Sequence, residues 1–342
     1  NGLPDEIQVE KLLKALESGD QVDFDALTRA GTRKLANPQA ALSVELSGAD
    51  PEGVNMPAPP ALNSREAAAE MMETYEKSVL RRCPFHTISS DTPQVELQRA
   101  LDTLNSYGEA FTGPKIGGVV TRKSLFRGNA VGDLVGPYIS QFMQDWLEIQ
   151  NGNVPVPQVI DSELKYIYNP RQLGSFVHAD FVYQAHLYAA SILVGEGAAR
   201  QSAFVSQTNE GSFVDNGGVA EIAAAVGEIS RHALKATWVQ KWRKHMRLRP
   251  EEMAGRIVKI EDGTLSSSAL HADIFRCGQD TIDAVKDHNL AEGGEEKAWM
   301  PLQYAEGSPT HPSYPAGHGV IAGACSTILK IYFADAAWST LG

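Results

Sequence analysis

Apolar side chains recur every three or four residues in several segments of the chain, which is the pattern of helices that bury one face. Shorter runs of this kind predict helices at 5–18, 64–81, 137–150, 174–195 and 318–333. The longest run, at 217–246, repeats Val219, Ile222, Val226, Ile229, Ala233 and Ala236. Alternating strand patterns are scarce, and neither a βαβ rhythm nor a dinucleotide-binding glycine loop occurs. The pattern therefore predicts an all-α fold, a bundle of helices that pack on one another.

Capping and turn residues mark several expected helix ends. Asn63 followed by Glu66 is typical of a capping box and predicts the start of the 64–81 helix. Pro137 suits a first helical position, and Gly195 is expected to end the 174–195 helix. Residues 215–217 (Asp-Asn-Gly) are predicted to cap the long helix and carry no chemistry.

The chain is expected to divide into an arm and a helical body. The first part is rich in loops and prolines, ending in the run at 57–60 (Pro-Ala-Pro-Pro), which blocks regular structure. We interpret 1–62 as a loop-rich N-terminal arm and 63–342 as a helical catalytic domain. The acidic, glycine-containing segment at 287–297 is predicted to be a solvated connection.

Composition limits the classes of partner. The 342 residues carry a formal net charge of -12, which disfavours binding of nucleic acid or of anionic membrane over the whole surface. No stretch approaches the ~18 consecutive apolar residues of a membrane span, so none is expected. Three scattered cysteines without a C-x-x-C spacing are interpreted as buried thiols (Cys83, Cys277 and Cys325). The sequence gives little indication of cellular location, and a secreted, periplasmic or cell-surface protein is slightly favoured. Because the chain starts at Asn1 and not at Met, removal of a leader peptide is left as an alternative.

A basic cluster stands out in this acidic chain. Residues 241–249 hold five Lys and Arg side chains, and Pro250 predicts that the long helix ends at Arg249. Eight residues of helix would separate Lys241 and Arg249 by ~12 Å, which two long side chains can close around one small oxyanion. The alternative is a solvated basic helix end, which is the expectation for Arg243, Lys244 and Arg247.

A second segment, 306–319, combines prolines and glycines with the start of a helix. A helix N-terminus exposes unpaired N–H groups, and Gly317 lets an anion approach the backbone. His318 at that position can exchange a proton near neutral pH. Taken alone, His318 would be interpreted as a polar capping residue. A metal ion shared by His311 and His318 is a weaker alternative, because two prolines separate the two histidines.

Together these segments resemble the signature of the vanadium haloperoxidases, which share a site plan with the helical acid phosphatases. The signature is Lys, then Arg-Pro about eight residues on, then Pro-Ser-Gly-His. Here the matching positions are Lys241, Arg249-Pro250 and Gly317-His318. The long His-Pro-Ser-Tyr-Pro form at 311–315 is closer to algal and bacterial bromoperoxidases, and the likeness extends over roughly residues 130 to 330.

The resemblance implies a vanadate cofactor, with hydrogen peroxide and a halide as substrates and an organic acceptor as a further partner. It makes Lys241 and Arg249 vanadate contacts, Gly317 a backbone donor, and His318 the acid/base residue. His311 matches the halide-site position, which favours bromide or iodide, with chloride as an alternative. It also suggests a homo-oligomer.

Two departures from the signature matter. Ala316 stands where the family often has a Ser that binds a vanadate oxygen. No Ser-Arg-x-x-x-Gly-x-His follows in the 24 residues after His318, so the axial His is not in this chain, and we expect a chain truncated before that segment. The alternatives are an acid phosphatase of the same fold and a catalytically inactive helical binding protein.

Overall fold

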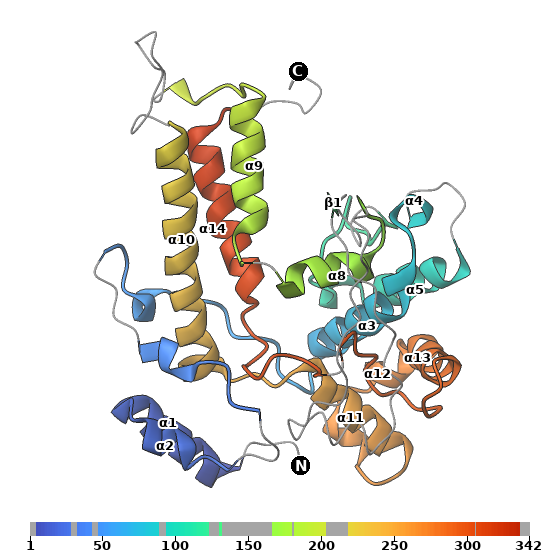
Figure 1. The fold of residues 1–342 in the computed structure, drawn as a ribbon. Coiled ribbons are helices and arrows are strands. Elements are labelled where there is room, and N and C mark those ends of the chain that lie inside the picture. Colours follow the sequence, from blue (N-terminus) through green and yellow to red (C-terminus); the bar gives the residue numbers. More distant parts are fainter. Residues whose placement is uncertain are drawn as a thin grey trace.

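The computed structural model describes residues 5–28, 33–42, 47–88, 94–122, 130–131, 166–179, 181–202, 218–304 and 306–335. Helices dominate these residues (Figure 1), and the one small sheet pairs β1 (Ala130–Val131) with β2 (Tyr166–Ile167) antiparallel. The all-α prediction is confirmed.

The α-helices are α1 (Glu6–Ser18), α2 (Gln21–Asp25), α3 (Arg65–Val79), α4 (Phe85–Ile88), α5 (Val95–Ser106), α8 (Pro170–Ala179), α9 (Gln184–Gly195), α10 (Val219–Val239), α11 (Pro250–Glu261), α12 (Asp273–Arg276), α13 (Gln279–Ala291) and α14 (Gly317–Tyr332). Short 3-10 turns lie at Pro38–Leu42, Pro51–Gly53, Leu80–Arg82, Gly108–Ala110 and Ser267–Ala269.

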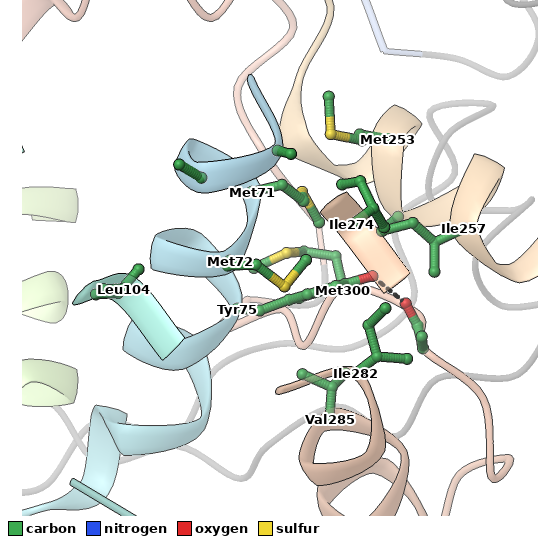
Figure 2. Close-up of a cluster of buried hydrophobic side chains, with 14 of the residues drawn as sticks. Met71, Met72, Tyr75, Leu104, Met253, Ile257, Ile274, Ile282, Val285 and Met300 are labelled. Atoms are coloured by element: carbon green, nitrogen blue, oxygen red, sulfur yellow. Dashed lines mark hydrogen bonds between the residues drawn. The ribbon is translucent and has the colours of Figure 1, made fainter. Parts of the chain in front are cut away.

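The largest core lies where α3 packs against α5, α11, α12 and α13. Figure 2 shows Met72 and Tyr75 of α3 facing Ile257 of α11 and Ile282 of α13, all fully buried. The Tyr75 hydroxyl donates to the backbone carbonyl of Ala298, so this buried polar atom is satisfied. The core fixes the position of α11, and Arg249 immediately precedes this helix.

A second unit consists of α9, α10 and α14, which run side by side in Figure 1. Apolar side chains of α10 and α14 meet in a buried cluster that contains Val226, Ala233, Ile321 and Cys325. This packing holds the start of α14 beside the last turns of α10. The two segments with candidate chemistry are therefore brought to the same end of these helices.

The N-terminal segment packs under the end of α10. Leu16 of α1 and Phe24 of α2 share a small core with Ala41 and with Trp242, which follows Lys241. The arm therefore contains helices and a core of its own, besides loops. Its division from the body at residue 62 stays a prediction.

The expected helices at 5–18, 64–81 and 318–333 are confirmed as α1, α3 and α14. The cap of α3 is Ser64, whose hydroxyl accepts from the backbone N–H of Ala67, and not the predicted Asn63. The expected helix at 137–150 and the cap at 215–217 lie outside the described residues. Within the described residues, no helix is both long and apolar enough to cross a membrane.

Two helix predictions need correction. The single helix expected at 174–195 is two helices, because residues 181–183 form a turn in which the N–H of Gln184 donates to the carbonyl of Phe181. The second helix ends at Gly195, as predicted. The acidic segment at 287–297 is only partly a connection, since its first residues complete α13, which ends at Ala291.

Candidate active site

Lys241 lies at the end of the long helix, where the backbone widens. α10 is regular to Val239 and continues as a π-helical turn, Gln240–His245, that the N–H of Met246 closes on the carbonyl of Lys241. Met246 has a positive φ of 41°, so the helix ends there. This agrees with the periodic run at 217–246 and corrects the end at Arg249 that Pro250 had predicted. Left-handed backbone at a non-glycine residue is uncommon, and single-turn π segments occur frequently at functional sites.

The side chain of Lys241 is buried beside the second segment. It is 1% exposed, and its Nζ donates to the carbonyl of Pro312 over 2.7 Å. The same ammonium lies 5.9 Å from the centre of the Trp238 ring, which favours a cation. An ammonium has three N–H donors, so the bond to Pro312 leaves two for another acceptor.

Arg249 begins the next helix. Its backbone is extended, with φ -79° and ψ 160°, and Pro250 takes the first position of α11. Proline disfavours a helical conformation in the residue before it, so the local sequence accounts for this geometry. The side chain is free to turn away from α11 toward the loop before α14.

Arg249 binds His311 through both its backbone and its ring. Nε donates to the His311 carbonyl over 3.1 Å, and Nη2 lies 3.0 Å from the imidazole Nδ1. A guanidinium can only donate, so the contact with Arg249 is a hydrogen bond only when Nδ1 carries no proton, whereas a contact of Nδ1 with a carbonyl is one only when Nδ1 carries the proton. Nδ1 is also 2.9 Å from the Pro312 carbonyl, which already accepts from Lys241.

Burial and neighbouring charges shift the pKa values of Lys241, His311 and Arg249. Burial and the nearby Arg249 charge lower the pKa of Lys241 to about 8. Burial lowers the pKa of His311 to about 4; the hydrogen bond to the Pro312 carbonyl opposes this shift, and the charges of Arg249 and Lys241 add to it. Burial also lowers the pKa of Arg249, partly offset by Glu251. The site therefore holds two close cations and a neutral histidine, which favours a bound anion.

The start of α14 lacks a side-chain cap. Ala316 is the N-cap residue, and its side chain makes no capping hydrogen bond to the first turn. A Cβ added at Gly317 would meet Trp238 and Leu234 at 3.8 and 3.9 Å, which is ordinary contact, so packing alone does not require glycine here. Ala316 and His318 are exposed, unlike the buried Lys241.

The arm holds the loop that carries His311, a contact that the sequence analysis did not foresee. Arg33 donates to the carbonyls of Glu306 and Ser308, and the Thr310 hydroxyl donates to the carbonyl of Lys34 over 2.7 Å. The N–H of Ala36 donates back to the Thr310 carbonyl over 2.9 Å. The sequence gives no signal of this contact between the arm and the His311 loop, because the arm residues belong to no repeated pattern.

A buried acid on α11 fixes the same loop. The Ser308 hydroxyl donates to Oε1 of Glu251, which is 2% exposed and lies two residues after Arg249. Glu251 carries no sequence signal of this role, because a Glu in a first helical turn is commonly only a favourable charge at the helix end. Here it ties the His311 loop to the helix that positions Arg249.

The other cations of the basic cluster bind elsewhere. Arg243 forms an ion pair with Glu52, and Lys244 donates to the carbonyl of the same residue. Arg247 binds Glu70 of α3 at 3.0 Å. The exposed Arg243 and Lys244 fit the expected role of surface cations, and Arg247 is a half-buried link between the cluster and α3.

Two cavities open on either side of Arg249. One, of about 450 Å³, is bounded by Glu70 of α3, His245, Tyr314 and Ala316. The other, of about 400 Å³, lies between α1 and the loop at 308–312 and reaches His311. Arg249 is therefore accessible from two directions.

The donor set suits an oxyanion better than a metal cation. In the part of the chain that the structure describes, no group of three or more His, Cys, Asp and Glu side chains could hold a metal ion. Lys241, Arg249 and the uncapped first turn of α14 all present N–H donors. Such donors fit the oxygens of a tetrahedral anion such as vanadate or phosphate.

Comparison with known proteins points the same way. The chain is 29% identical over 381 residues to a vanadium-dependent bromoperoxidase of Corallina pilulifera, covering 88% of this chain and 64% of the relative. A bromoperoxidase of the same description from Ascophyllum nodosum is 29% identical over 337 residues, covering 87% and 59%. No model of a protein family matches the chain.

A solved structure shows the fold. The homohexameric second vanadate-dependent bromoperoxidase of Ascophyllum nodosum superposes with a TM-score of 0.80 at 24% identity, covering 95% of this chain and 60% of that one. This chain has the vanadate-dependent bromoperoxidase fold. It spans about 60% of the length of the proteins it matches.

Proposed function

We propose that this chain contributes to a vanadate-dependent haloperoxidase that uses hydrogen peroxide to oxidise bromide or iodide. The observation that carries the proposal is the convergence of Lys241 and Arg249 on residues 311–312, directly before the uncapped start of α14. Similarity to the bromoperoxidases over 87–88% of the chain supports it.

Each site residue has a role in this proposal. Lys241 and Arg249 would hold the oxyanion through their charged N–H donors, and the Gly317 N–H would add a neutral donor. Bound vanadate would supply a Lewis acid centre that accepts peroxide without a change of oxidation state. The Lys241 ammonium would polarise bound peroxide, and His318 would serve as the acid/base group. The protein thus contributes preorganised donors in a partly dry site.

His311 is the residue proposed to face the halide. Its low pKa of about 4 keeps the ring neutral near pH 7, so it faces the halide as an uncharged group and not as a cation. The positive charge near the halide then comes from Lys241 and Arg249. Bromide and iodide release their hydration shells more readily than chloride, which fits a half-buried neutral group.

The test compares vanadate affinity and halide oxidation across matched variants. Equilibrium dialysis of the 342-residue chain measures vanadate binding, and bromination of a dye with added vanadate and peroxide measures turnover. Lys241→Met and Arg249→Met are expected to lower vanadate affinity about 10- to 150-fold each, the range for a charged hydrogen bond. Arg243→Met, which removes an exposed cation of the same cluster, is the control and should leave both readouts unchanged.

Phosphate-ester hydrolysis distinguishes the enzymatic alternative. Hydrolysis without vanadate, together with no halide oxidation, would replace the haloperoxidase proposal with a phosphatase. Failure to bind vanadate or phosphate at all would remove both. We also propose a homo-oligomer, in line with the homohexameric description of the matched structure, and sedimentation of the purified chain tests it.

A further inference from the structure

Glu251 is a buried acid without an ion pair. Among the described residues the buried acidic side chains are Glu76, Glu251 and Asp273. Glu76 binds Arg99 at 2.9 Å, and Asp273 binds Arg65 at 2.6 Å. Glu251 has no such cation; its partner is the neutral hydroxyl of Ser308. Burying a carboxylate without a paired cation is costly, so its presence here calls for a reason beyond packing.

The negative charge of Glu251 acts on the candidate anion site. Glu251 lies two residues after Arg249, and both residues line the cavity of about 400 Å³ that reaches His311. Burial lowers the pKa of Arg249, and the Glu251 charge opposes this shift. Glu251 is 2% exposed, so salt screens its charge much less than it screens a charge on the surface.

This charge changes how strongly the site attracts anions of different charge. Lys241 and Arg249 supply two positive charges, and Glu251 reduces the local sum to one. The energy between a fixed charge and a ligand is proportional to the ligand's charge, so the carboxylate repels a doubly charged anion twice as strongly as a singly charged one. Vanadate near neutral pH carries mainly one charge, whereas sulfate carries two.

We propose that Glu251 is a specificity-determining residue of the anion site, where it disfavours doubly charged tetrahedral anions relative to singly charged ones. This inference deepens the proposed function and rests on it, because both concern the site of Lys241 and Arg249. Glu251 acts through its charge and does not need to touch the anion. Its role is to keep dianions such as sulfate from competing with vanadate.

Two anions of similar shape and different charge test the proposal. Sulfate and perchlorate are both tetrahedral, and each is titrated by calorimetry at pH 6.5 and constant ionic strength, where Lys241 is charged. Glu251→Gln removes the charge and keeps an oxygen that can accept from Ser308. We expect perchlorate to bind about three-fold more tightly in this variant and sulfate about nine-fold, the square of that factor. The ratio of sulfate to perchlorate affinity then rises about three-fold.

Two control variants separate charge from structure. Glu66 lies in the first turn of α3, as Glu251 does in α11, but it is exposed. Glu66→Gln therefore removes the same charge from the same helical position, and it should leave the ratio unchanged. Ser308→Ala removes the hydrogen bond and keeps the carboxylate. Both affinities should fall by a similar factor as the loop loosens, so the ratio should again stay the same.

A double variant covers the case in which Glu251→Gln does not fold. Glu251→Met combined with Ser308→Ala removes both partners and leaves neither polar group unpaired, an exchange that is often nearly neutral for stability. Its sulfate-to-perchlorate ratio is compared with that of Ser308→Ala alone and should be about three-fold higher. Circular dichroism and urea unfolding check the fold of every variant.

An unchanged ratio in Glu251→Gln or in the double variant would overturn the proposal. An equal gain for both anions would reduce Glu251 to a structural role and overturn it too, as would a rise of the same size in Glu66→Gln. Lys241→Met distinguishes this failure from failure of the proposed function. Anion binding that Lys241→Met weakens, with an unchanged ratio in Glu251→Gln, removes only the present inference. Absence of any binding that depends on Lys241 removes the anion site and both proposals.

Discussion

The guanidinium of Arg249 contacts His311 at two points: Nε lies 3.1 Å from the backbone carbonyl, and Nη2 lies 3.0 Å from the ring Nδ1. One planar group thereby sets both the position of the loop and the orientation of the imidazole. Since Lys241 holds the next carbonyl, at Pro312, the two cations fix consecutive residues of the same loop. The geometry of the anion site and the orientation of His311 are therefore coupled.

Arg249→Lys should disrupt this coupling while keeping the charge. A lysine has no planar fork, so it cannot bind the carbonyl and the ring together. We expect vanadate affinity to fall at least ten-fold and the His311 ring resonances to shift in NMR spectra. Arg243→Lys, an exposed site paired with Glu52, is the matched control. Unchanged His311 resonances in Arg249→Lys would contradict the assigned role.

Anion affinity should depend on pH through Lys241. Its pKa of about 8 means that the ammonium is charged below that pH and neutral above it. Sulfate keeps one charge state between pH 6 and 9.5, so its affinity should be flat near pH 6 and fall as the pH rises through about 8. Calorimetric titration of sulfate measures this. Lys241→Met should show weaker binding without the step, and a step that persists there would assign it to another group.

The same shift has a consequence for stability. The folded-state pKa of Lys241 lies below its ordinary value of 10.5, so between about pH 8 and 10.5 the unfolded chain binds more protons at this residue. The unfolding free energy of the wild type, compared with Lys241→Met, should therefore rise with pH across this window. Urea unfolding at pH 7.5 and pH 10 makes the comparison, and a relative loss of stability at pH 10 would contradict it.

Ala316→Ser should improve both the helix and the anion site. Ala316 already has extended N-cap backbone, with φ -70° and ψ 122°, but offers no side-chain acceptor. A serine oxygen can accept from a first-turn N–H, stabilising the protein by about 0.5–2 kcal/mol, while its hydroxyl donates to a bound oxyanion. Urea unfolding with and without vanadate measures the two effects. Ala322→Ser, inside α14, is the control and should give neither gain.

Gly278→Ala should destabilise the main core. An added Cβ would overlap Sδ of Met72 and the backbone carbonyl of Ile274, and the latter cannot move without disturbing α12. Overpacking of this kind costs about 1–3 kcal/mol, or more where backbone must shift. Gly195→Ala is the comparison, because no atom lies within 4 Å of its added Cβ. A loss of stability below about 0.5 kcal/mol for Gly278→Ala would show that the core adapts.

The meeting of the two chemistry-bearing segments could be predicted from the sequence. A cationic cluster in an acidic chain and a proline- and glycine-rich helix start are both anion-binding features, and the structure brings Lys241 and Arg249 to residues 311–312. Strong periodicity likewise predicted α3 and α14 within a residue or two at their starts. These features depend on local sequence, so a single chain reveals them.

What could not be predicted depends on long-range packing. The π-helical turn after Val239 has no local signal, and it moved the helix end from Arg249 to Met246. Residues 181–183 form a turn, but they are apolar. The periodic pattern therefore continued through them and predicted one helix in place of two. Glu251 is informative only once Ser308 is known to lie beside it.

The contact between the arm and the His311 loop has a consequence for how the protein is made. Arg33 and Glu306 are 273 positions apart, so this part of the site must await synthesis of nearly the whole described chain. Closing so long a loop is entropically costly and typically slow. We therefore expect the anion site to be one of the last regions to assemble after translation.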